Sequence, residues 1–78
     1  MWQFNRTGTR TGIKTALAAF TPPQGADAAQ VATARAAIDA EIDALDAAFN
    51  GVRVTAQGNI QGAQRSFTVA VTPLNLAI

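Results

Sequence analysis

The chain lacks the residue types on which most catalytic and metal sites depend. Its 78 residues include no cysteine, histidine or tyrosine, which excludes disulfides, thiolate metal sites and the usual neutral-pH general base. Ser66 is the single serine, and no threonine has a histidine partner to activate it. We therefore expect a protein that is not an enzyme, with no catalytic residue, no cofactor and no metal ligand.

Charge is scarce and nearly balanced. The formal net charge of +1 creates no global attraction to nucleic acid or to a membrane. No stretch of about 20 residues is apolar enough to span a bilayer, and the first residues do not have the pattern of a signal peptide. We expect synthesis in the cytoplasm and no export by a signal peptide.

One alanine-rich segment contains all five acidic residues and has a helical pattern. Its large apolar residues recur at spacings of seven, four, three and four: Val31, Ile38, Ile42, Leu45 and Phe49. The pattern predicts a long amphipathic helix over residues 26–49. Asp27 would lie at its positive end, and Asn50-Gly51 would end it with a left-handed residue.

Three carboxylates, Asp39, Asp43 and Asp46, border this helix on one edge. A single helix presents them on a convex surface, where a cation would keep most of its water, so we predict no metal site. They could instead attract basic residues of a neighbouring copy of the chain, namely Arg6, Arg10 and Lys14.

The first quarter of the chain predicts a short strand and a short helix. The strand covers residues 2–6, and a polar basic loop follows at residues 5–12. Thr11 would cap a helix over residues 12–20, which ends before Pro22 because a residue preceding proline avoids helical angles. The loop differs from a phosphate-binding loop in its glycine and lysine spacing. Its basic residues are still candidate anion or charge contacts: Arg6, Arg10 and Lys14.

After residue 51 the apolar pattern changes to a period of two. It predicts hairpin strands over residues 52–60 and 65–72, followed by an apolar tail over residues 74–78, which either forms a further strand or docks. The predicted order is β-α-α-β-β. We expect one α+β domain, a two-layer sandwich in which the long amphipathic helix packs on an antiparallel sheet.

Two groups of residues are candidate protein contacts. The first is a face of small residues opposite the large apolar stripe of the long helix: Ala29, Ala36, Ala40 and Ala47. The second is a set of apolar residues near the two ends of the chain: Trp2, Phe4, Leu74, Leu76 and Ile78.

These features favour a non-enzymatic structural assembly protein, namely a small bacteriophage virion component of the capsid or tail. Its partners would be other protein subunits, either itself or a larger particle. One alternative is a free cytoplasmic module that binds a protein through the alanine face or the apolar tail. A weaker alternative is a nucleic-acid accessory protein that uses five cations: Arg6, Arg10, Lys14, Arg53 and Arg65.

Overall fold

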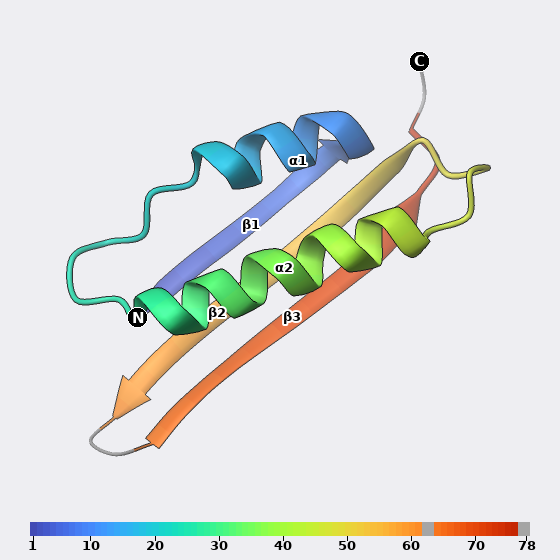
Figure 1. Ribbon diagram of the computed structural model, residues 1–78. Helices are drawn as coiled ribbons and strands as arrows, with labels where there is room; N and C mark the ends of the chain where they lie inside the picture. The colour runs from blue at the N-terminus through green and yellow to red at the C-terminus, as the bar shows by residue number, and fades with distance from the viewer. Residues whose placement is uncertain (62–63, 77–78) are drawn as a thin grey trace.

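Two helices pack on one face of a three-stranded antiparallel sheet (Figure 1). The computed structural model describes residues 1–61 and 64–76. Its elements, in chain order, are β1 (Trp2–Thr9), α1 (Arg10–Ala19), α2 (Ala28–Ala44), β2 (Gly51–Gln61) and β3 (Gln64–Leu74). This arrangement confirms the predicted α+β fold and the order β-α-α-β-β.

Strand β2 is the centre of the sheet, so β1 and β3 are its two edges. The β1 ladder runs from Trp2 opposite Gly58 to Thr9 opposite Gly51. The β2–β3 ladder is longer and continues to Gln61 opposite Gln64. The end of the β2–β3 hairpin therefore extends beyond β1, and it contributes to the elongated shape of the molecule, which measures 44 × 19 × 16 Å.

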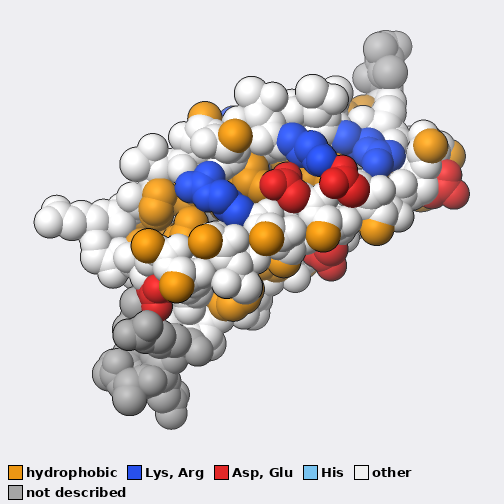
Figure 2. Space-filling view, viewed as in Figure 1, with side chains coloured by type: hydrophobic (Ala, Val, Ile, Leu, Met, Phe, Trp, Pro, Cys, Tyr) orange, Lys and Arg blue, Asp and Glu red, His pale blue; other side chains and the backbone are white. Residues whose placement is uncertain are grey.

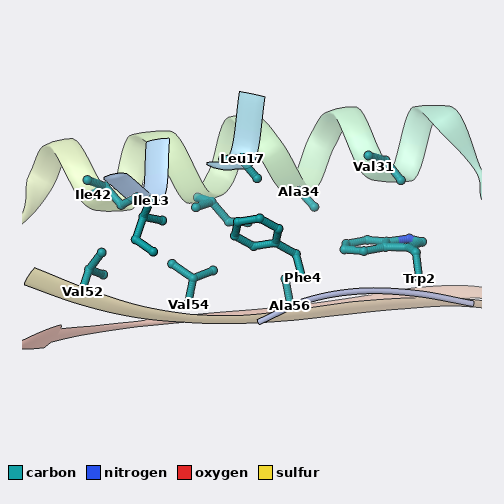
Figure 3. Close-up of a cluster of buried hydrophobic side chains, with 11 residues drawn as sticks. Trp2, Phe4, Ile13, Leu17, Val31, Ala34, Ile42, Val52, Val54 and Ala56 are labelled. Carbon is teal, nitrogen blue, oxygen red and sulfur yellow. The ribbon is translucent and has the colours of Figure 1, made fainter. Parts of the chain in front are cut away.

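The core lies between the sheet and the two helices (Figure 3). In β2, Val52 and Val54 are fully buried because period-two alternation directs them to the same face. The buried hydrophobic side chains come from β1, α1, α2 and β2: Trp2, Phe4, Ile13, Leu17, Val31, Ala34, Ile38, Ile42, Val52, Val54 and Ala56. The helical members recur three or four residues apart, as one face of an α-helix requires.

The predicted loop over residues 5–12 is wrong. Residues 5–9 continue β1, because each pairs with a residue of β2. These residues show no apolar alternation, because the helix-side positions in this part of β1 are Gly8 and the exposed Arg6, which pair in register with Val52 and Val54. Helix α1 begins at Arg10, and its N-cap is Thr9 rather than Thr11, with Thr9 Oγ1 accepting the amide of Gly12 at 3.0 Å.

The long helix is shorter than predicted at both ends. Asp27 is its N-cap and accepts the amides of Ala29 and Gln30, so the helix begins at Ala28 rather than at residue 26. It ends at Ala44, five residues before the predicted end. Among the described residues only Gly25 has a positive φ, so the predicted left-handed stop at Asn50-Gly51 is also wrong.

Local hydrogen bonds replace the missing helical turn. The Asp46 carboxylate accepts the amide of Ala48 at 2.8 Å, and the Asp46 carbonyl accepts the amide of Phe49 at 3.0 Å. Turns closed by an Asp side chain compete with helix in this way. Gly51 belongs to β2, and a Cβ at this position would overlap the side chain of Leu76. The glycine is needed for close approach rather than for a turn.

The C-terminal segment docks through Asn50. The Asn50 side chain accepts the amide of Leu76 at 2.6 Å and donates to its carbonyl at 2.9 Å. Leu74, predicted to open the tail, is the last residue of β3, and Pro73 is accommodated because β3 is an edge strand. Residues 77–78 of the predicted tail lie outside the described residues. Within the described part of the chain, no helix is long and apolar enough to cross a membrane.

The close approach at Gly58 gives a first prediction. A Cβ at Gly58 would overlap the Trp2 indole nitrogen and Oε1 of Gln30. Gly58→Ala should therefore lower the free energy of unfolding by about 2 kcal/mol, as measured by urea denaturation. Gly8→Ala is the matched control, because its Cβ would meet Ile13 Cδ1 at an ordinary 3.8 Å. Equal stability of the two variants would contradict this account of the packing.

Candidate functional site

Trp2 and Phe4 are not available to a partner, contrary to the prediction. They are 3% and 5% exposed and lie on the core side of β1. Both rings contact Phe20, with centroid distances of 6.3 and 5.5 Å. Their burial follows from the alternation of β1 beneath the helices (Figure 3).

Gln30 joins three parts of the fold, a role that the sequence analysis missed. Its Oε1 accepts the Trp2 indole N–H at 2.9 Å, and its Nε2 donates to the Ser66 carbonyl at 3.0 Å. A buried amide left without partners would cost free energy. The available signal was its position: Gln30, four residues before Ala34 and eight before Ile38, lies on the buried face of α2.

Two of the three predicted basic contacts bind the chain itself. Arg10 donates to the carbonyls of Ile42, Asp46 and Phe49 at 2.8, 3.2 and 3.4 Å. Lys14 forms an ion pair with Asp43. Arg10 and Lys14 therefore already have partners within the same chain, and their attraction to carboxylates of a neighbouring copy stays a prediction.

The row of charges between the helices is visible in Figure 2, where Lys and Arg side chains lie beside Asp and Glu side chains. Arg35, which the sequence analysis did not use, belongs to this row of charges between the helices. Its guanidinium donates to the carbonyls of Leu17 and Phe20 and lies 5.6 Å from the centre of the Phe20 ring. The last turn of α1 is held to α2 by these contacts.

The predicted alanine contacts are exposed to solvent: Ala29, Ala36, Ala40 and Ala47. Small hydrophobic side chains form separate spots along α2 in Figure 2. The predicted tail contacts differ, because Leu74 and Leu76 are half-buried against their own chain, and Ile78 lies outside the described residues. The alanine face is thus open, and the described part of the tail is largely occupied.

Arg6 is the exposed member of the basic group and lies at the β1 edge. It pairs in register with the buried Val54, so it occupies a position on the helix side of the sheet. A depression of about 430 Å³ borders it, between β1 and the end of α1. An inward-facing charge on an edge strand hinders another strand from pairing there.

The opposite edge, β3, has neither charge nor proline between Ser66 and Thr72. No charged residue occurs from Ser66 to Leu74, and residues 67–72 are phenylalanine, threonine, valine and alanine only, most of which favour extended structure. Alternate residues of an edge strand direct their backbone N–H and C=O groups away from the sheet, and among the described residues no further strand pairs with β3 on that side. Phe67 is 38% exposed on this strand.

The sheet face opposite the helices is polar along all three strands. One row across it consists of Asn5, Thr55 and Ala70, which lie opposite one another in register and are all exposed. The next row contains Thr7, Arg53 and Thr72. This face is compatible with water. Of the two edges, β3 is the one that combines outward backbone groups with an uncharged stretch and the exposed Phe67.

Compared with protein-family models, curated protein sequences and solved structures, the chain shows no match. Among residues 1–61 and 64–76, no three or more His, Cys, Asp or Glu side chains are grouped so as to hold a metal ion. The function is therefore inferred from the geometry of the chain alone.

The contacts of Arg10 give a second prediction. Arg10→Ala leaves the carbonyls at the end of α2 without their donor and should lower the free energy of unfolding by about 2 kcal/mol in urea denaturation. Lys14→Ala removes an exposed ion pair and should change the free energy of unfolding by less than about 0.5 kcal/mol. The account fails if Arg10→Ala is as mild as Lys14→Ala.

Proposed function

We propose that this protein is a non-enzymatic structural subunit that joins a larger protein assembly through the edge of β3. The observation that carries the proposal is the stretch Ser66–Thr72 of that edge strand, which contains neither charge nor proline. Monomeric proteins usually block such edges with charge, proline or a covering element. Here Arg6 blocks the β1 edge, whereas β3 from Ser66 to Thr72 has no such feature.

The β3 edge supports assembly more directly than the alanine face of α2 or the polar face of the sheet, because it offers backbone groups for strand pairing. An added strand satisfies the outward N–H and C=O groups of β3 and covers part of Phe67. The bacteriophage capsid or tail predicted from the sequence is the setting that we propose for this subunit, on the basis of its size and alanine-rich composition.

The nucleic-acid alternative is less well supported by the geometry. Phosphate binding needs cations that can reach the backbone of the nucleic acid, and Arg10 and Lys14 are engaged within the chain. The protein-binding alternative keeps its exposed alanine face, but no second feature on that face indicates a ligand. The β3 edge therefore remains the better supported contact surface.

The third prediction tests this surface by changing one exposed residue on it. Ala70→Lys places a charge on the β3 edge and should raise the dissociation constant for self-association by at least about tenfold. Light scattering over a concentration series measures it. Asn5→Lys is the matched control, because Asn5 lies in the same row of the same face at the other edge.

Wild type and Asn5→Lys should both increase in mass with concentration, whereas Ala70→Lys should stay near the monomer mass of 8.1 kDa. A mass near 8.1 kDa for all three proteins at every concentration would count against assembly through this edge. So would equal self-association of the two lysine variants.

A further inference from the structure

The geometry points to a second copy of the same chain as the partner of β3. We propose that two copies pair antiparallel along β3, around a two-fold axis that passes beside Ala70. This inference rests on the proposed function and deepens it, because it names the partner, the strand direction and the register.

The register follows from the two faces of the sheet. A two-fold axis perpendicular to the sheet keeps helices on the same side in both copies, so residues that lie opposite each other must face the same side. The uncharged stretch Ser66–Leu74 overlaps itself most completely when its central residue, Ala70, lies on the axis.

Cross-strand pairs in this register are complementary. On the polar face, Thr68 of one copy lies opposite Thr72 of the other, a pairing that favours hydrogen bonds between hydroxyl groups. On the helix side, Val69 lies opposite Val71, and the exposed Phe67 lies opposite Pro73. In a two-fold contact, a charged residue of β3 near the axis would lie close to the same residue of the other copy and repel it. The absence of charge from Ser66 to Leu74 removes this repulsion.

The helices leave room for this pairing. Arg35 and Asp43 of α2 face α1, as their contacts with Leu17 and Lys14 show. At 100° per residue, the opposite flank of α2, on the β3 side, presents three small residues, Thr33, Ala37 and Ala44, together with the exposed Glu41. Two such flanks would face each other across the axis, and small side chains permit the close spacing of 8–10 Å between packed helices.

A head-to-tail contact between β3 of one copy and β1 of the next is the main competing geometry. It repeats through further copies and yields a ring of more than two copies or an open filament, rather than a two-fold dimer. Arg6 on the helix side of β1 disfavours it, because a strand added there would confront that charge. A two-fold contact at β3 closes after two copies, so its mass stops increasing at twice 8.1 kDa.

Cysteine pairing tests the register directly, since the chain has no native cysteine. A mixture of the single variants Thr68→Cys and Thr72→Cys should form a covalent dimer on oxidation. Either variant alone should form at least about tenfold less, because identical positions then lie four residues apart, about 13 Å, which exceeds the reach of a disulfide. Ala70→Cys alone should crosslink, because it lies on the axis, and Asn5→Cys should not.

The outcomes separate this inference from the proposed function. A closed dimer mass with crosslinking of the mixture and of Ala70→Cys supports it. A mass that keeps increasing, or a stable oligomer in which Thr68→Cys crosslinks as well alone as in the mixture, overturns the two-fold register and leaves the structural-subunit proposal in place. A monomer at every concentration, with no crosslinking, overturns both.

Discussion

Both helices pack on the same face of a three-stranded sheet, and this one-sided packing decides which surfaces the protein has left. The core is complete beneath α1 and α2, where β2 is buried on its inner face. The sheet face opposite the helices is exposed to solvent, and its side chains are mainly polar. The two edges remain, and they differ: β1 carries the inward Arg6, whereas β3 from Ser66 to Thr72 carries no charge. Both edges present outward backbone groups, and among the described residues the edge without charge is β3 from Ser66 to Thr72.

Buried and partly buried polar contacts connect the layers of the fold. Gln30 links the N-terminal strand, through Trp2, to β3, through the Ser66 carbonyl. Arg10 donates hydrogen bonds to carbonyls at the end of α2, and Arg35 donates hydrogen bonds to carbonyls at the end of α1. Each of these links connects elements distant in sequence, so losing one leaves buried groups without partners. The edge of β3 thus belongs to the packed sheet rather than to a loop.

Periodicity alone was enough to predict the element order and the layers, because Val31, Ile38 and Ile42 mark a helix face and Val52 and Val54 mark a strand face. It failed where tertiary contacts override local signals. Residues 5–9 pair with β2 although they have no apolar alternation. Helix α2 ends before Asn50, where Arg10 donates to the Asp46 carbonyl and the Asp46 carboxylate accepts the amide of Ala48. The contact residues were harder to predict. Trp2 and Phe4 resemble free apolar ends until the sheet pairing buries them, and the β3 edge appears only once the strand order is known.

Backbone hydrogen exchange of β3, resolved by residue, tests the central claim most directly. The account predicts that every amide from Phe67 to Thr72 exchanges slowly at high protein concentration, because both sides of the strand are then hydrogen-bonded. On dilution, protection should be lost at alternate residues only, those that face away from β2. Alternating fast and slow amides that do not change with concentration would contradict it, since they would show that the outer side of β3 remains open to water.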